Sequence, residues 1–197
     1  MNNRGFTLVE MIVAVALFAI VMVVCVAALL ALVNANRKAQ ALESVMNNLN
    51  IALDGIVRNA RMGSNYDGSG ACAGNTDSSP KDCTSGSTVF SFEPYGSTHK
   101  HPDGSTYMDP PWVYSFAKDS NGVGRIYKSE NGQTAIPITA PEVSIDDMEF
   151  YVVGTTPGDT AQPKVLIVIK GTAGVPGSRA QTTFHIQATA VQRVLDL

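Results

Sequence analysis

The sequence is short of reactive and charged side chains. Its 197 residues include 3 cysteines, 3 histidines and 1 tryptophan, and only 16% are Asp, Glu, Lys or Arg. We find no phosphate-binding glycine loop, no dinucleotide fingerprint and no nucleophile–base pair. These absences argue against an enzyme and give no reason to expect a cofactor. The length suits one globular domain together with one membrane-spanning helix.

Two further absences define the N-terminal part. Proline does not occur before Pro80, and residues 11–33 carry no charge. As a helix those residues would be about 34 Å long, enough to cross a hydrocarbon core of about 30 Å. A cleaved secretory signal has an apolar core of only about 7–15 residues, so a retained span is favoured. Cleavage after Ala35 is the alternative, and the polar Asn34 and the acidic Glu10 disfavour it.

The helical pattern continues beyond the membrane span. Apolar residues recur there at the three- and four-residue spacing of an amphipathic helix, namely at Leu42, Val45, Met46, Leu49, Ala52, Leu53, Ile56, Val57 and Ala60. The segment Gly63-Ser64-Asn65 supplies a stop signal. We therefore predict one helix over about residues 7–62, near 84 Å long at about 1.5 Å per residue.

Basic residues are scarce in the remainder of the chain. After residue 62 there are 9 Lys or Arg against 14 Asp or Glu, a net charge of −5. Nucleic-acid binding draws much of its affinity from basic side chains on phosphates, so this balance disfavours DNA as a partner.

The three cysteines have different settings. Cys25 lies within the apolar run, where we expect a small membrane-buried side chain. Cys72 and Cys83 flank a stretch rich in Gly, Ser and Asp, and their spacing fits neither a redox pair nor a zinc site. We predict a disulfide that pins a loop over residues 65–87 and stabilises it by about 2–3 kcal/mol. The alternative is a pair of unbonded thiols.

Short strand candidates separated by turn signals follow the loop. They cover residues 88–92, 112–118, 123–129, 143–153, 165–169 and 182–195. The segment Asp119-Ser120-Asn121-Gly122 between the second and third candidates is typical of a hairpin. We predict an α+β fold in which the long N-terminal helix packs on an antiparallel β-sheet.

Two segments could in principle bind metal. His99-Lys100-His101 has the alternation of a two-ligand site on a strand, but it lies between Gly96 and Pro102 and is better interpreted as a solvated loop. Residues 119–130 partly match a calcium loop, with Val123 in a position that needs a side-chain oxygen. The hairpin interpretation is preferred there, and we predict no metal site.

One acidic residue stands out at the start of the apolar run. Glu10 follows Gly5-Phe6-Thr7-Leu8-Val9, and the first residues, Met1-Asn2-Asn3-Arg4, are polar and basic. An acidic side chain at the centre of a membrane helix costs about 2.5–3.5 kcal/mol, so Glu10 needs a partner. A glutamate hydrated at the lipid headgroups is the alternative. Together these residues resemble the type IV prepilin leader and N-terminal helix shared by pilins, minor pilins and type II secretion pseudopilins.

The resemblance carries specific implications. A prepilin peptidase would cut between Gly5 and Phe6, and Phe6 would then be N-methylated. Glu10 would pair with the α-amino group of a neighbouring subunit, a pairing that offsets two desolvation costs in lipid. The leader (1–5) would face the bacterial cytoplasm, the helix (6–33) would cross the inner membrane or lie in a filament core, and the helix continuation (34–62) and sheet domain (63–197) would be extracytoplasmic.

The subtype is predicted from weaker signals. Pilins often carry a proline within the membrane helix, where this chain has Val26-Ala27-Ala28. The segments 147–150 and 187–193 look most like J-type minor pseudopilins and related minor pilins. We therefore predict a minor pilin or pseudopilin whose partners are other pilin-like subunits. A major pilin and an adhesive or DNA-uptake tip subunit are the alternatives.

Overall fold

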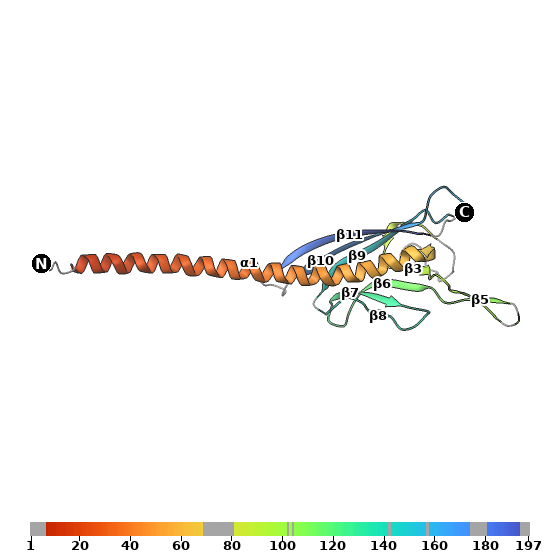
Figure 1. Ribbon diagram of the computed structural model, residues 1–197, viewed down its shortest axis with the longest axis horizontal. Helices are drawn as coiled ribbons and strands as arrows, with labels where there is room; N and C mark the ends of the chain where they lie inside the picture. Colours follow the sequence, from red (N-terminus) through yellow and green to blue (C-terminus); the bar gives the residue numbers. More distant parts are fainter. Residues whose placement is uncertain are drawn as a thin grey trace.

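The structure, a computed structural model, describes residues 7–68, 81–101, 103, 105–141, 143–156, 158–173 and 181–193. One long helix, α1 (Leu8–Met62), packs its second half against a β-sheet domain, while its first half projects well beyond that domain (Figure 1). The predicted α+β fold, with a long N-terminal helix on an antiparallel sheet, is confirmed.

Local hydrogen bonds explain where α1 begins and where it ends. Thr7 caps the N-terminus, because its hydroxyl oxygen accepts a hydrogen bond from the Glu10 backbone amide. At the other end the Gly63 amide donates to the carbonyl oxygens of Asn59 and Ala60 at 3.1 and 2.9 Å. The helix bounds predicted from the apolar spacing and the Gly63 stop signal are therefore confirmed.

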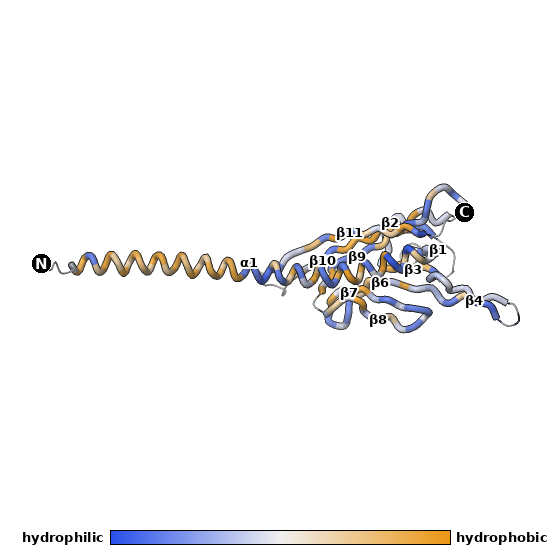
Figure 2. Tube along the Cα trace, in the orientation of Figure 1, coloured by the Kyte–Doolittle hydropathy of each residue, from blue (hydrophilic) through white to orange (hydrophobic). Residues whose placement is uncertain are grey.

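The two halves of α1 meet different surroundings. Apolar side chains are exposed on every side of the first half, and the helix becomes alternately polar and apolar where it enters the domain (Figure 2). The second half buries one apolar stripe against the sheet, formed by Val45, Leu49, Ala52, Leu53, Ile56 and Ala60. One continuous helix thus joins an apolar rod to a globular domain.

The main sheet has nine strands paired antiparallel, with the order β1-β3-β6-β7-β9-β10-β11, while β2 pairs with β9 and β8 with β7. The strands β4 and β5 form a separate hairpin. In chain order the strands are β1 (Ser64–Asp67), β2 (Cys83–Ser87), β3 (Val89–Glu93), β4 (Thr98–Lys100), β5 (Thr106–Met108), β6 (Trp112–Lys118), β7 (Gly124–Ser129), β8 (Ile136–Pro137), β9 (Ser144–Val153), β10 (Lys164–Ala173) and β11 (Thr182–Val191).

The six predicted strands correspond to β3, β6, β7, β9, β10 and β11, with shifts at their ends. The final strand ends at Val191, earlier than predicted. The segment 65–87, predicted as one loop, begins and ends in strands, because β1 pairs with β3 and β2 pairs with β9. The segment around His99, predicted as a solvated loop, is also a strand, since β4 pairs with β5.

An aromatic cluster fills the space between α1 and the sheet. The ring of Phe90 lies 5.3 Å from Tyr66, 5.5 Å from Phe92 and 5.7 Å from Phe150, measured between ring centroids. The Tyr66 hydroxyl donates a 2.6 Å hydrogen bond to the Ala60 carbonyl oxygen, and burial raises the pKa of that hydroxyl. The cluster therefore ties the last turn of α1 to β1 and β3.

Replacing Gly63 by Ala is expected to destabilise the domain by about 1–3 kcal/mol, the usual cost of overpacking. A β-carbon on Gly63 would lie 2.2 Å from Cδ2 of Phe92 and 2.9 Å from the carbonyl oxygen of Glu93, so the last turn of α1 would have to move. Urea unfolding of the full chain in detergent measures the loss.

Gly55→Ala is the matched control on the same helix. A β-carbon there meets no atom of the described residues within 4 Å, so the better helix propensity of alanine should stabilise the domain by about 1 kcal/mol. Equal effects of the two substitutions would contradict the packing argument.

Candidate functional site

The N-terminus of α1 holds Glu10 in a reciprocal cap with Thr7. The Glu10 amide donates to Oγ1 of Thr7 at 3.3 Å, while Oε2 of Glu10 accepts from the Thr7 backbone amide at 3.4 Å and from its hydroxyl at 3.3 Å. This arrangement is a capping box, which satisfies two backbone amides that the helix start leaves without partners. The negative carboxylate also lies at the positive end of the helix dipole.

The sequence interpretation of Glu10 missed this second role. The signal was present, because Thr7-x-x-Glu10 before an apolar run is the capping-box pattern.

The Glu10 carboxylate keeps acceptor positions that the cap does not use. Its hydrogen bonds are long for their kind, the Glu10 side chain is exposed, and an ionised carboxylate offers about four acceptor positions. A cationic donor from outside the chain can therefore reach Glu10 while the cap stays in place.

The helix that carries Glu10 is suited to lipid. Within the described residues, α1 is the one helix long and apolar enough to cross a membrane, and none of its most apolar window is buried in the protein. The large apolar side chains of this half are exposed all round, as in helices that lie in lipid or pack among apolar neighbours. Cys25 is exposed on the same half and is a free thiol.

The structure describes only some of the other predicted site residues. Gly5, Phe6 and Cys72 lie outside the described residues, so the cleavage and N-methylation positions remain predictions. Cys83 is buried in β2, opposite Val152 of β9. The disulfide between Cys72 and Cys83 also stays a prediction.

The two segments weighed as metal sites have other structural roles. Nε2 of His99 lies 2.9 Å from Oδ2 of Asp109 at the base of the β4–β5 hairpin. Oδ2 of Asp119 accepts a hydrogen bond from Arg125, and Oδ1 accepts from the amides of Val123 and Asn121. Together these contacts lower the pKa of the Asp119 carboxyl. These contacts support the β6–β7 hairpin turn. Among the described residues no group of three or more His, Cys, Asp or Glu is placed to hold a metal ion.

Comparison with protein families gives one match. Residues 1–33 match the model described as the prokaryotic N-terminal methylation motif. No curated protein and no solved structure matches the chain. The motif indicates a type IV pilin-like prepilin, which confirms the resemblance seen in residues 5–10, and it implies processing by a prepilin peptidase and assembly with other pilins. The matched region covers the capping box and the apolar half of α1.

Proposed function

We propose that the chain is a minor pilin or pseudopilin, a structural subunit of a type IV pilus or type II secretion filament. The chain is first inserted into the bacterial inner membrane. It is cleaved there between Gly5 and Phe6, N-methylated on Phe6, and then assembled into the filament through α1. The sheet domain faces outward. The observation that carries the proposal is an exposed carboxylate, Glu10, at the start of a helix half whose apolar side chains face outward on every side.

The exposed apolar surface supports this role. Burial of apolar surface contributes about 25 cal/mol per Å², so the apolar half of α1 is stable only in lipid or beside other apolar helices. The membrane surrounds this half with lipid before assembly, and the filament core surrounds it with other apolar helices afterwards. Glu10 then favours one register of docking, because an unpaired charge in such surroundings is costly.

Two features support a minor over a major subunit. The helix runs without interruption through Val26-Ala27-Ala28, where pilins often carry a proline. The sequences of segments 147–150 and 187–193 also look most like those of J-type minor pseudopilins and related minor pilins. We therefore expect the protein to be scarce in purified filaments compared with the main subunit, as measured by quantitative mass spectrometry; a share equal to or above that of every other subunit would identify a major pilin.

Processing tests the proposal directly. Protein from cells with the prepilin peptidase is expected to begin at N-methylated Phe6, and protein from cells without it at Met1. Mass analysis of the N-terminal peptide measures this. A Gly5→Leu variant adds a side chain where the protease must approach the backbone closely, so it should stay uncut. Cleavage after Ala35, or an intact Met1 in cells with the peptidase, would contradict the proposal.

A further inference from the structure

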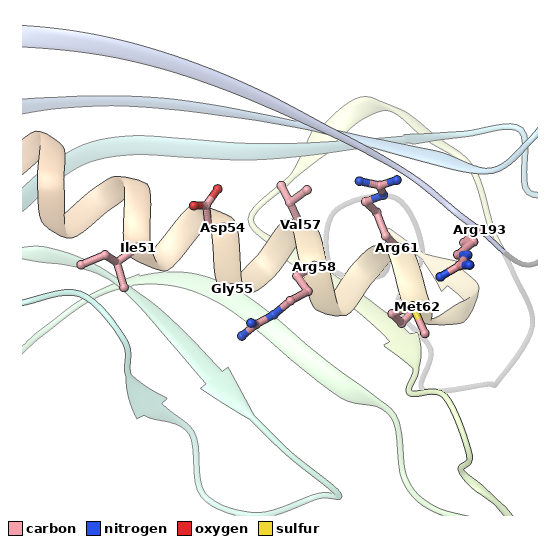
Figure 3. A pocket seen from close by; sticks show the side chains of 8 residues that line it. All are labelled: Ile51, Asp54, Gly55, Val57, Arg58, Arg61, Met62 and Arg193. Carbon is pink, nitrogen blue, oxygen red and sulfur yellow. The ribbon is translucent and has the colours of Figure 1, made fainter.

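The outward face of α1 bears a groove where the helix lies in the sheet domain. Seven residues of the helix between Ile51 and Met62 line it together with Arg193, and its volume is about 720 Å³ (Figure 3). Arg193 is brought there by a 2.9 Å hydrogen bond from its backbone amide to the Arg61 carbonyl oxygen. We call this surface the arginine groove.

One line of residues along the arginine groove is largely apolar. Ile51, Gly55, Arg58 and Met62 follow the four- and three-residue spacing of one helix face. Ile51 is 75% exposed, and a β-carbon on Gly55 would meet no atom within 4 Å. Glycine is the poorest helix former after proline, and none of the residues that the structure describes packs closely enough to require it at this position. Its flat surface suits close approach by another molecule.

The charges of the arginine groove are unbalanced. Three arginines, Arg58, Arg61 and Arg193, line it against one carboxylate, Asp54. Figure 3 shows the guanidinium groups of Arg58 and Arg61 extending to opposite sides of the helix. A single compact anion could not contact both. An elongated acidic partner lying across the helix could.

We propose that the arginine groove receives an acidic helix from another pilin-like subunit of the same filament. The inference rests on the proposed function, since the groove lies on the helix through which the chain would join its neighbours. Two helices pack with axes about 8–10 Å apart, and a glycine at the crossing permits the shorter distances. Carboxylates spaced along one face of the partner would meet Arg58 on one side of α1 and Arg61 on the other.

Other occupants fit less well. The same helix of a second copy is basic beyond the span, with two acidic residues against four basic ones. The acidic residues are Glu43 and Asp54, and the basic ones are Arg37, Lys38, Arg58 and Arg61. DNA binds mainly through phosphate contacts, whereas Ile51, Gly55 and Met62 give the groove an apolar line along its length. Apolar side chains interspersed with arginines are typical of a protein interface.

Substitution of Gly55 tests the close approach. The full-length Gly55→Leu chain is expressed in its own membrane with its sister subunits present, and its amount is measured in sheared filaments. Gly55→Leu should fold, because the added side chain points into open space, and should reduce recovery at least about tenfold if the crossing is central to binding. Asn47→Leu, at an exposed position of α1 outside the groove, is the matched control. Equal recovery of the two variants would overturn the inference.

Charge reversal tests the chemistry of the partner. The double variant Arg58→Glu/Arg61→Glu should lose filament recovery, while Lys118→Glu/Lys164→Glu, with the same change in net charge at exposed positions, should not. A photo-crosslinker at position 51 should link to a helix of another pilin-like subunit. Reversing the acidic residues of that helix to Lys should restore recovery of the arginine double variant.

The outcomes separate the inference from the proposed function. Leader cleavage and recovery of the unaltered chain in filaments are read from the same cells and depend on the proposed function alone. With both present, crosslinks to a second copy or to DNA, or failure of the reversed helix to restore recovery, would overturn the acidic-helix inference. Absence of cleavage in the unaltered chain would instead overturn the proposed function.

Discussion

A Glu10→Gln variant is expected to be cleaved and N-methylated normally but to be lost from filaments. Glutamine serves at the third position of a capping box as glutamate does, so the contacts with Thr7 can persist. The substitution removes the charge that would pair with a neighbour's α-amino group in apolar surroundings. Removing one partner of such a pair costs about 3–5 kcal/mol, so incorporation should fall by at least about a hundredfold. Quantitative mass spectrometry of sheared filaments measures it.

Two further variants separate the charge from the cap. Glu10→Val removes both the charge and the cap. This variant chain should also be cleaved normally and then be excluded from filaments. Thr7→Val weakens the cap and keeps the carboxylate; it should cost about 0.5–2 kcal/mol of helix stability and leave incorporation largely intact. If Glu10→Gln enters filaments as well as the unaltered chain, while Glu10→Val does not, then Glu10 acts as a helix cap and not as an assembly contact.

The elements predicted best from the sequence are those with a long uniform pattern. The bounds of α1 follow from an uncharged apolar run, a three- and four-residue spacing up to Ala60, and a glycine stop. The strands β6, β9 and β10 follow from alternation or from a continuous apolar run. In each case many residues carry the same signal, so one exception such as Gly55 does not obscure it.

The elements that were missed lack such a pattern. The strand β2 reads Cys-Thr-Ser-Gly-Ser, with Gly86 at a φ of +87°, and its pairing with β9 comes from a partner more than sixty residues away. The hairpin of β4 and β5 lies in a turn-rich segment and is exposed, so burial leaves no periodic signal. Such strands owe their structure to their neighbours and not to local propensity.

The two candidate sites also differ in how far the sequence predicts them. Residues 5–10 form one contiguous motif, so the pilin-like resemblance could be predicted from the sequence, although the reciprocal contact of Glu10 with Thr7 was not. The arginine groove could not be predicted, because it depends on Arg193 reaching Arg61 across 132 positions of the chain. Arginines such as Arg58 and Arg61 are common on a helix surface, and only the folded structure brings Arg193 beside them.

Phe90→Ala is expected to be the most destabilising single change in the sheet domain. Phe90 is fully buried and contacts the rings of Tyr66, Phe92 and Phe150, so its loss leaves a cavity beside α1 and removes three aromatic contacts. Phenylalanine to alanine in a core costs about 3–5 kcal/mol. For a domain of this size the melting temperature should fall by roughly 6–20 °C.

The single tryptophan provides the measurement. Trp112 lies 6.2 Å from Phe92 between ring centroids, next to the aromatic cluster, so its fluorescence should follow unfolding of the domain in detergent-solubilised full-length protein. Ile136→Ala is the control, because Ile136 is 61% exposed and its truncation should change stability by less than about 0.5 kcal/mol. A melting temperature equally affected by both variants would mean that the cluster around Phe90 does not hold α1 against the sheet. If Phe90→Ala alone unfolds the domain, filament recovery should fall with normal leader cleavage, because the proposed cleavage position precedes α1 in the chain and the cluster lies at the C-terminal end of that helix.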